Sequence, residues 1–210
     1  MDIKTLWENG SIEDWEGVVS KYYNAVKSNN IEVEQKLNAM TANEFKQMTG
    51  QEFYRFLVGD YSTWKYTDNR RKATVRHNIE NFHQKFTDDE FEKILDAAFL
   101  IDKDDIFLHF ANMTRITGIG TAGASGVLPL IFPEYFGTVD RFLVENLKKI
   151  YDGQSYYGKK LKSMKSDSLT NYDAIILTQI LREKAEEVNK KLKTDKFTPR
   201  KIDMALWSVR

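Results

Sequence analysis

The 210-residue sequence predicts an all-α fold, and three observations lead to this prediction. Apolar side chains recur every three or four residues through most of the chain, which is the spacing of one helix face. Residue patterns that cap helices stand before several of these periodic stretches. No segment shows a pattern that predicts a strand. A chain of this length can bury most of its apolar surface, as one domain or as two small ones.

In the N-terminal half, capping residues and periodicity mark the ends of the expected helices. Residues 41–44, Thr-Ala-Asn-Glu, form a capping box, in which the Thr and Glu side chains satisfy the first N–H groups of a helix. Residues 87–90, Thr-Asp-Asp-Glu, form a second one. The aromatic and polar segment 60–70 has no periodicity and predicts an ordered loop. The expected helices are 12–27, one from 41 that carries Phe45 through Leu57, 71–86, and one from 87 that carries Phe91 through Phe99.

The C-terminal half predicts five further helices. Asp104 or Asp105 is expected to cap a helix that carries Ile106 through Met113. Thr198 and Pro199 supply an N-cap and a proline at the first helical position for the last helix. The segment 151–165 is rich in Gly, Tyr and Lys and predicts irregular structure. The other expected helices are 121–132, one that starts near 138–140 and ends at 150, and 172–192.

Composition excludes several classes of protein. Hydrophobic residues make up 41% and charged residues 30%, as in ordinary soluble proteins, and no apolar run is long enough for a membrane span. The N-terminus lacks the features of a signal peptide, so we expect a cytoplasmic protein. Without cysteine there is no disulfide, no thiol nucleophile and no Cys-bound zinc or iron–sulfur cluster. His77, His83 and His109 form no metal pattern, and no nucleotide-binding loop is present.

The net charge is zero, but the charges are unevenly distributed. Residues 61–86 carry 6 basic and 2 acidic groups, and residues 106–210 carry 17 and 11. Residues 1–60 and 87–105 are acidic. Such segregation predicts a basic face, centred on Arg70, Arg71 and Lys72 and on the C-terminal half. Ordinary solvated helix faces explain the same pattern equally well.

The most informative segment is Thr117-Gly118-Ile119-Gly120, a glycine-punctuated break between two helical patterns. The following residues 121–126 are small, so the second helix begins without a bulky side chain over its free N–H groups. Such a helix start is suited to bind a phosphate group. Residues 137–140, Gly-Thr-Val-Asp, follow. Asp140 lies at the start of a predicted helix, where its carboxylate is favoured. A role as a helix cap alone is the open alternative.

Together these features resemble the helix-hairpin-helix motif and the trailing Gly/Pro-Val-Asp of the DNA glycosylase superfamily that includes endonuclease III. The resemblance covers about residues 104–150, and the wider sequence is similar to bacterial members that lack the iron–sulfur cluster. It implies two helical lobes with a cleft between them. One lobe would span approximately 41–150 and end in the hairpin, about 106–132, and Asp140. The other would combine approximately 1–40 with 151–210.

The resemblance implies roles for individual residues. Asp140 would be the catalytic carboxylate, which stabilises positive charge developing on the sugar or activates the attacking water. Ala122 stands where lyases of this superfamily hold the lysine that forms a Schiff base, so strand cleavage by that route is not expected. Lys65, Lys159 and Lys160 are the candidates for a displaced nucleophile, although they are more simply ordinary surface lysines.

Further residues are implied in DNA contact. The expected contacts with the DNA backbone are Thr117, Gly118, Gly120, Thr121, Ala122, Arg200 and Lys201. The candidates for a base pocket or a wedge are Trp64, Lys65, Tyr66, Asp203 and Trp207, since a flipped base needs stacking surfaces and polar groups. For Trp64 and Trp207 a role as core anchors is an open alternative. The backbone carbonyls of Thr114, Ile116 and Ile119 would hold a monovalent cation.

The expected function is therefore that of a monofunctional DNA N-glycosylase, which acts as a monomer on double-stranded DNA without a required cofactor or nucleotide. The base would be alkylated, oxidised, or hypermodified as in foreign viral DNA, so repair and antiviral defence both stay open. A non-catalytic helix-hairpin-helix DNA-binding protein is the main alternative. A third hypothesis is a protein–protein interaction domain in which the hairpin serves only for packing.

Overall fold

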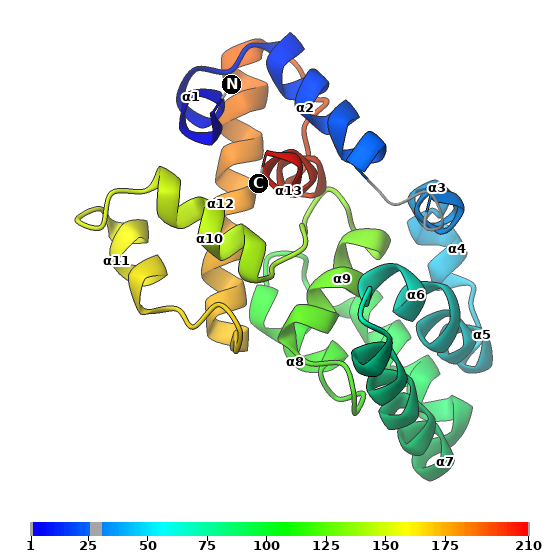
Figure 1. Cartoon of the computed structure of the whole chain (residues 1–210). Helices are drawn as coiled ribbons and strands as arrows, with labels where there is room; N and C mark the ends of the chain where they lie inside the picture. Colours follow the sequence, from blue (N-terminus) through cyan, green and yellow to red (C-terminus); the bar gives the residue numbers. More distant parts are fainter. Residues whose placement is uncertain (1, 26–30, 210) are drawn as a thin grey trace. The chain divides into compact units, whose positions relative to one another are not determined.

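In the computed structural model, which describes residues 2–25 and 31–209, every regular element is a helix (Figure 1). The predicted all-α class is confirmed. A π-helical segment, Leu57–Tyr61, lies between α5 and α6. The α-helices are α1 Ile3–Asn9, α2 Ile12–Ala25, α3 Ile31–Ala39, α4 Ala42–Lys46, α5 Gly50–Phe56, α6 Ser62–Lys65, α7 Asn69–Leu100, α8 Ile106–Met113, α9 Thr121–Ile131, α10 Arg141–Ile150, α11 Tyr156–Ser163, α12 Asn171–Leu192 and α13 Pro199–Ser208.

The chain divides into two compact units. The terminal unit combines residues 1–26 with 133–210, and the central unit spans 27–132. The expected division placed the boundaries near residues 40 and 150 instead. The difference arises because α10 packs on α1 and α13, whereas α3 packs on α6. As a result the hairpin belongs to the central unit and Asp140 to the terminal unit.

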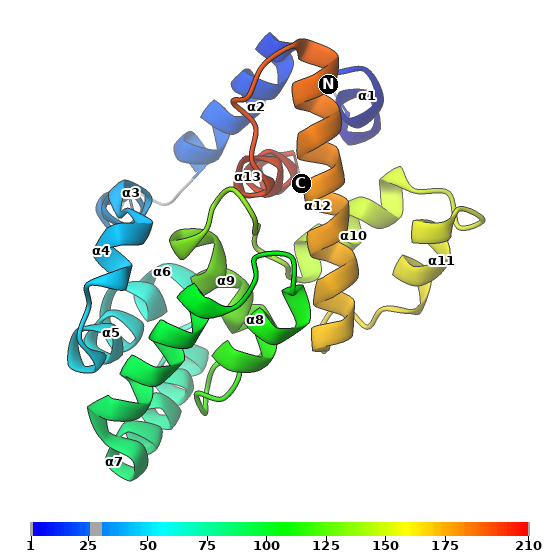
Figure 2. The same cartoon turned by 180° about the vertical axis from the view of Figure 1, so that it is seen from behind.

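The terminal unit is built around α12 and α13. The last helix, α13, packs against both α2 and α12, and α10 packs against α1, α11 and α13 (Figure 2). Trp15, Leu181 and Leu206 are fully or almost fully buried in its core. The Asn146 side chain donates a hydrogen bond to the carbonyl of Leu206 over 2.8 Å, which fixes α10 on α13.

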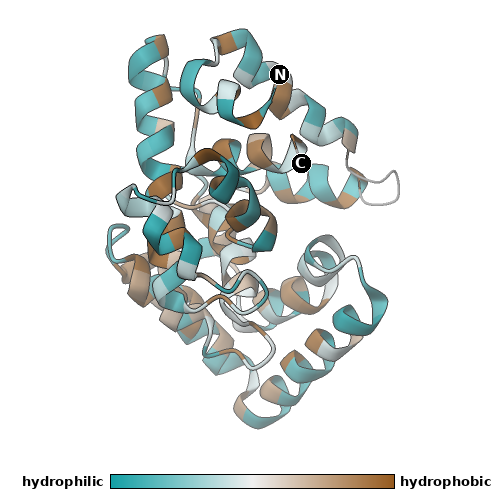
Figure 3. Ribbon diagram, turned by 60° about the vertical axis from the view of Figure 1, so that its left-hand side comes forward, coloured by the Kyte–Doolittle hydropathy of each residue, from teal (hydrophilic) through white to brown (hydrophobic). Residues whose placement is uncertain are grey.

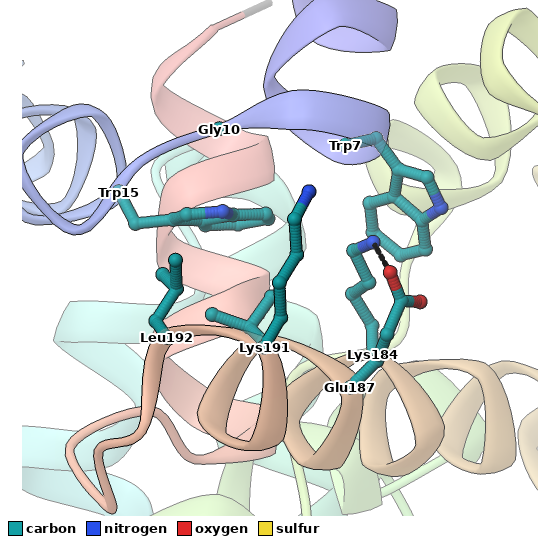
Figure 4. A pocket seen from close by; sticks show the side chains of 8 residues that line it. Trp7, Gly10, Trp15, Lys184, Glu187, Lys191 and Leu192 are labelled. Atoms are coloured by element: carbon teal, nitrogen blue, oxygen red, sulfur yellow. Dashed lines mark hydrogen bonds and ion pairs between the residues drawn. The ribbon is translucent and has the colours of Figure 1, made fainter.

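Two tryptophans, Trp7 on α1 and Trp15 on α2, hold these helices against α12 in the same unit (Figure 4). The Lys184 side chain is only 3% exposed, and its ammonium lies 4.8 Å from the centroid of the Trp7 ring. It donates to Glu187 Oε1 over 2.8 Å. Lys191 extends between Trp7 and Trp15 and donates to the Glu8 carbonyl over 3.0 Å. The lysine stems thus fill the space between the indoles, as long cationic side chains do on apolar surfaces.

The central unit is organised along α7. This helix is interrupted at Thr87, whose φ of 59° and ψ of −172° are not helical, so the predicted helix break at this residue is confirmed. The α5 and α8 helices pack on α7, and α9 packs on α8. Phe53, Phe91 and Phe110 are completely buried in its core. Asp105 caps α8 by accepting a hydrogen bond from the Leu108 N–H, which decides between the two predicted capping residues.

Three predicted segments differ from the structure. The helix expected from residue 41 is two helices, because a second capping box, formed by Thr49 and Glu52, opens α5 after α4 has ended. The segment 151–165 is not irregular throughout, since Ser155 caps the helix α11. The loop expected over 60–70 is helical up to Lys65.

The π-helical segment before α6 is braced by polar side chains. The Ser62 hydroxyl donates to the carbonyl of Val58. Arg76 on α7 donates from Nε to the Ser62 hydroxyl over 2.7 Å and from Nη2 to the Thr63 hydroxyl over 2.9 Å. These hydrogen bonds hold the π-helical segment and the start of α6 against α7.

The helices carry hydrophilic and hydrophobic residues on different sides, as expected when one face of each packs inward (Figure 3). No helix in the described ranges has both the length and the apolar character needed to cross a membrane.

Candidate nucleic-acid interface

The hairpin turn between α8 and α9 is held against α7 by Gly118. This residue has a φ of +101°, a conformation that side chains other than glycine rarely adopt. A Cβ atom here would lie 2.9 Å from Asn78 Cβ and 3.0 Å from the Val75 carbonyl oxygen. Ile116 and Ile119 on either side are buried, and the Ile119 N–H donates to the Ile116 carbonyl. The expected glycine thus serves first to bring the turn close to α7.

The N-terminus of α9 has no side-chain cap. Gly120 occupies the N-cap position in an extended conformation and is exposed. A Cβ atom at Gly120 would have no neighbour within 4 Å. Thr117 is exposed too, while Thr121 and Ala122 are half-buried. The predicted helix start without bulky cover is therefore present in the central unit.

Two tyrosines, Tyr61 and Tyr66, pack against the first turns of α9. Tyr61 donates its hydroxyl hydrogen to the Gly123 carbonyl. A Cβ at Gly123 would lie 2.9 Å from Tyr66 Oη, and one at Gly126 would lie 2.9 Å from Tyr61 Oη. Burial raises the pKa of Tyr61 well above its usual value. Tyr66, expected in a base pocket or as a wedge, is only 7% exposed and instead packs against α9.

Trp64 and Lys65 also make contacts inside the central unit. The Trp64 indole N–H donates to the carboxylate of Glu34, which is 3% exposed. The Lys65 ammonium lies 5.9 Å from the Trp64 ring centroid, and its Cδ would be 3.0 Å from a Cβ at Gly126. These contacts agree with the core alternative for Trp64, although both side chains are half-buried rather than enclosed.

Part of the predicted basic segment lies near the start of α9. The guanidinium carbon of Arg71 is 5.6 Å from the centroid of the Tyr66 ring. The hydroxyl oxygen of the same tyrosine would lie 2.9 Å from a Cβ at Gly123, so Tyr66 links Arg71 to the first turn of α9. Arg70 and Arg71 are both exposed at the start of α7. By contrast, Arg115 in the turn pairs with Glu90.

Asp140 caps α10 in the terminal unit. Its Oδ1 atom accepts hydrogen bonds from the N–H groups of Phe142, over 2.9 Å, and Leu143, over 3.2 Å. The residue is half-buried and lies in extended backbone. Among the described residues, none donates a hydrogen bond to Oδ2. The cap thus orients the carboxylate and leaves its second oxygen available.

The backbone just before Asp140 is anchored by a buried ion pair on α13. Arg200 Nη1 lies 2.7 Å from Asp203 Oδ2 and donates to the Thr138 hydroxyl over 3.0 Å. Asp203 Oδ2 also accepts from the Thr138 N–H over 3.1 Å. Arg200 and Asp203 are 6% and 7% exposed. Their expected roles at the DNA backbone and in the base pocket need correction, because both side chains are engaged inside the terminal unit.

Two other residues of α13, Lys201 and Trp207, are accessible to solvent at least in part. Lys201 is exposed and donates to the Lys196 carbonyl over 2.7 Å. Trp207 is half-buried, with its ring in a T-shaped contact with Tyr22 at 5.1 Å between centroids. Lys159 and Lys160 are exposed on α11. The ion pair of Arg200 with Asp203 was missed in the sequence, where only their spacing of three residues in a helix hinted at it.

The expected cation ligands lie around the hairpin turn. The Ile116 carbonyl accepts a hydrogen bond from the Ile119 N–H over 2.9 Å, and the Thr114 hydroxyl donates one to the Phe110 carbonyl. The cation therefore stays a prediction. Within residues 2–25 and 31–209, no group of three or more His, Asp or Glu side chains is arranged to hold a metal ion. Of the histidines, His109 is buried and His83 contacts Asp88 at 2.7 Å.

The chain was compared with protein-family models, with curated proteins and with solved structures, and none of them matches it. The hypothesis of a helix-hairpin-helix glycosylase thus depends on the turn residues 117–122, on the uncapped start of α9 and on Asp140.

Proposed function

We propose that the protein is a monofunctional DNA N-glycosylase. The observation that carries the proposal is the combination of an uncapped α9 start, behind a glycine turn, with a carboxylate whose one oxygen is held by two N–H groups. The first element suits a phosphate of the DNA backbone. The second suits a fixed negative charge beside a sugar that becomes cationic.

In this proposal Asp140 acts on a nucleotide turned out of the duplex. The bond between C1′ and the base nitrogen breaks, and the base leaves with the electron pair. The Asp140 carboxylate stabilises the positive charge left on the sugar, more strongly in the transition state than in the ground state. A water molecule then forms the new bond to C1′. Its proton is released, and the departing base gains one.

Strand cleavage is not part of the proposed reaction. Ala122 has a methyl group where a lyase would need an amine to attack C1′ and form a Schiff base. The product would be an intact strand with an abasic site. Alkylated, oxidised and hypermodified bases are the proposed substrate classes, and the protein would act as a cytoplasmic, nucleoid-associated monomer.

The DNA backbone would be held by the start of α9, with residues 117–122, and by neighbouring cations. Arg70 and Arg71 on the central unit and Lys201 on the terminal unit are exposed and able to meet phosphate groups. A monovalent cation on the carbonyls of Thr114, Ile116 and Ile119 would add a further positive charge. Binding of this kind weakens as salt is added, because it releases counterions from the DNA.

The test is base release from duplexes that carry alkylated, oxidised, deaminated or hypermodified bases, with abasic sites developed by alkali. We would compare wild type with Asp140→Asn and with Asp2→Asn. Asparagine caps helices about as well as aspartate, so Asp140→Asn should remain folded. Asp2 is a matched control, because it caps α1 through the same two N–H positions, those of Lys4 and Thr5.

Release that appears only after alkali, and that is lost in Asp140→Asn but kept in Asp2→Asn, is the expected result. Equal release by wild type and Asp140→Asn would refute the catalytic role. The second candidate function is a non-catalytic DNA-binding protein, favoured by the fact that Asp140 already serves as a cap. It predicts salt-dependent duplex binding by all three proteins and release by none.

A further inference from the structure

A second helical hairpin, formed by α10 and α11, carries a concentration of lysines. Figures 1 and 2 show the two helices connected by a short turn, and they pack on each other. Residues 148–165 contain six lysines and one acidic residue, Asp152, in a chain whose net charge is zero. This segment therefore holds most of the basic excess of the C-terminal half.

The lysines of α11 lie on its solvent side. Gly158 and Leu161 are buried and define the inner face. Lys159, Lys160 and Lys162 are exposed, as is Lys165 beyond the helix end. The exposed residues also include Tyr156, 68% accessible, whose ring centroid lies 5.8 Å from the Lys160 ammonium. We call Tyr156, Lys159, Lys160, Lys162 and Lys165 the α11 patch.

Nearby acidic groups do not neutralise the α11 patch. In the described part of the chain, none of its four lysines forms an ion pair with an acidic side chain. The Asp152 carboxylate accepts a hydrogen bond from the Gln154 N–H within the turn. Burial, together with a hydrogen bond to Glu183 on α12, raises the pKa of Tyr157. Glu145 is exposed on α10.

The patch is held in place by contacts that do not use its own cations. Lys148 on α10 donates to the Met164 carbonyl over 3.1 Å, across the end of α11. Ser155 caps α11 through the Gly158 N–H over 3.0 Å. Three lysines are thus presented from one short, fixed helix, and the fourth, Lys165, lies two residues beyond its end.

We propose that the α11 patch is a second contact surface for the phosphate backbone of duplex DNA, on the terminal unit. This inference rests on the proposed function and extends it. Lysines act as point charges on phosphates, and contacts with phosphates carry no sequence information, so the contact should be independent of sequence. An anionic membrane is the weaker candidate, because α11 exposes no large aliphatic or Phe side chain for insertion.

The test is a salt series of duplex binding with two triple variants of equal charge change. The first is Lys159→Gln, Lys160→Gln and Lys162→Gln together. The control replaces Lys21, Lys93 and Lys190, which are also exposed but lie on other helices, by Gln. At about 0.9 per phosphate contact, loss of three contacts should lower the slope of log K against log salt by about 2.7. Between 50 and 200 mM salt this amounts to about a 40-fold smaller loss of affinity than in wild type.

A reduced slope in the first variant, with the wild-type slope in the control, would support the inference. It would be overturned by a wild-type slope in the first variant or by an equal reduction in both. It would also be overturned if wild type bound no duplex, or if the first variant lost only binding to phosphatidylserine vesicles. Base release by wild type is measured separately, so the proposed activity and the α11 patch can fail independently.

Discussion

The substitution Gly118→Ala tests whether the hairpin turn is built as described. Two costs add up at this position. A positive φ costs an L-residue about 1–2 kcal/mol. The new Cβ would lie 2.9 Å from Asn78 Cβ and 3.0 Å from the Val75 carbonyl, and overpacking of this kind costs about 1–3 kcal/mol. The free energy of unfolding should therefore fall by roughly 2–5 kcal/mol.

The assay is thermal unfolding followed by circular dichroism, together with urea denaturation. For a chain of this size about 1 kcal/mol corresponds to 2–4 °C, so Tm should fall by roughly 4–20 °C. Gly17→Ala is the matched control, because Gly17 lies inside α2 and a Cβ there meets nothing within 4 Å. Alanine is the better helix former by about 1 kcal/mol, so this variant should be slightly stabilised. A Gly118→Ala protein as stable as wild type would refute the reasoning.

Three further predictions concern other parts of the molecule. Asp203→Ala leaves the Arg200 guanidinium buried without its carboxylate and should lower the free energy of unfolding, measured by urea denaturation, by about 3–5 kcal/mol. A loss below about 1 kcal/mol would contradict the role of this ion pair as an anchor. Burial lowers the pKa of Lys184 below its unfolded value of 10.5, so the charge on its ammonium destabilises the folded state at neutral pH. This destabilisation decreases as the pH rises towards 10.5, because the folded protein loses the proton first. The Tm advantage of Lys184→Met over wild type should therefore shrink over that range, and a constant difference would count against it. Ala122→Lys should allow borohydride to trap a covalent complex with a substrate duplex, and no trapping by an active variant would argue against the alignment of this position.

The sequence was most informative where local signals decide the structure. Thr41 and Thr198 are N-caps as predicted. The helix breaks at Thr87 as predicted, but the predicted capping box over 87–90 is wrong, because Thr87 has a positive φ and the Glu90 carboxylate pairs with Arg115 instead. The loop expected over 60–70 is wrong for residues 60–65, because their helical form depends on distant partners. Arg76 braces it from α7, and Tyr61 finds its hydrogen-bond acceptor on α9, 62 residues away. No local pattern contains that information.

The candidate site was predictable to a similar degree. The glycine turn and the carboxylate at a helix start are local features, and both are present. Arg200 and Asp203 could not be assigned from sequence, because a pair spaced three apart in a helix either faces solvent or turns inward. Here the pair turns inward, because Thr138 offers its hydroxyl as an acceptor to Arg200 and its N–H as a donor to Asp203. Tertiary contacts thus moved two polar residues from the expected surface to the interior.

The π-helical segment Leu57–Tyr61 determines the directions in which Tyr61 and the side chains of α6 point from the helix axis. Such a segment is equivalent to one residue inserted into an α-helix, and one residue corresponds to about 100° of rotation. Deleting any one of residues 57–60 would restore the α-helical count and rotate Tyr61 away from Gly123. The hydrogen bond that supports the α9 start therefore depends on the number of residues in the π-helical turn. A one-residue deletion in this turn should lower the stability of the protein more than many side-chain replacements there.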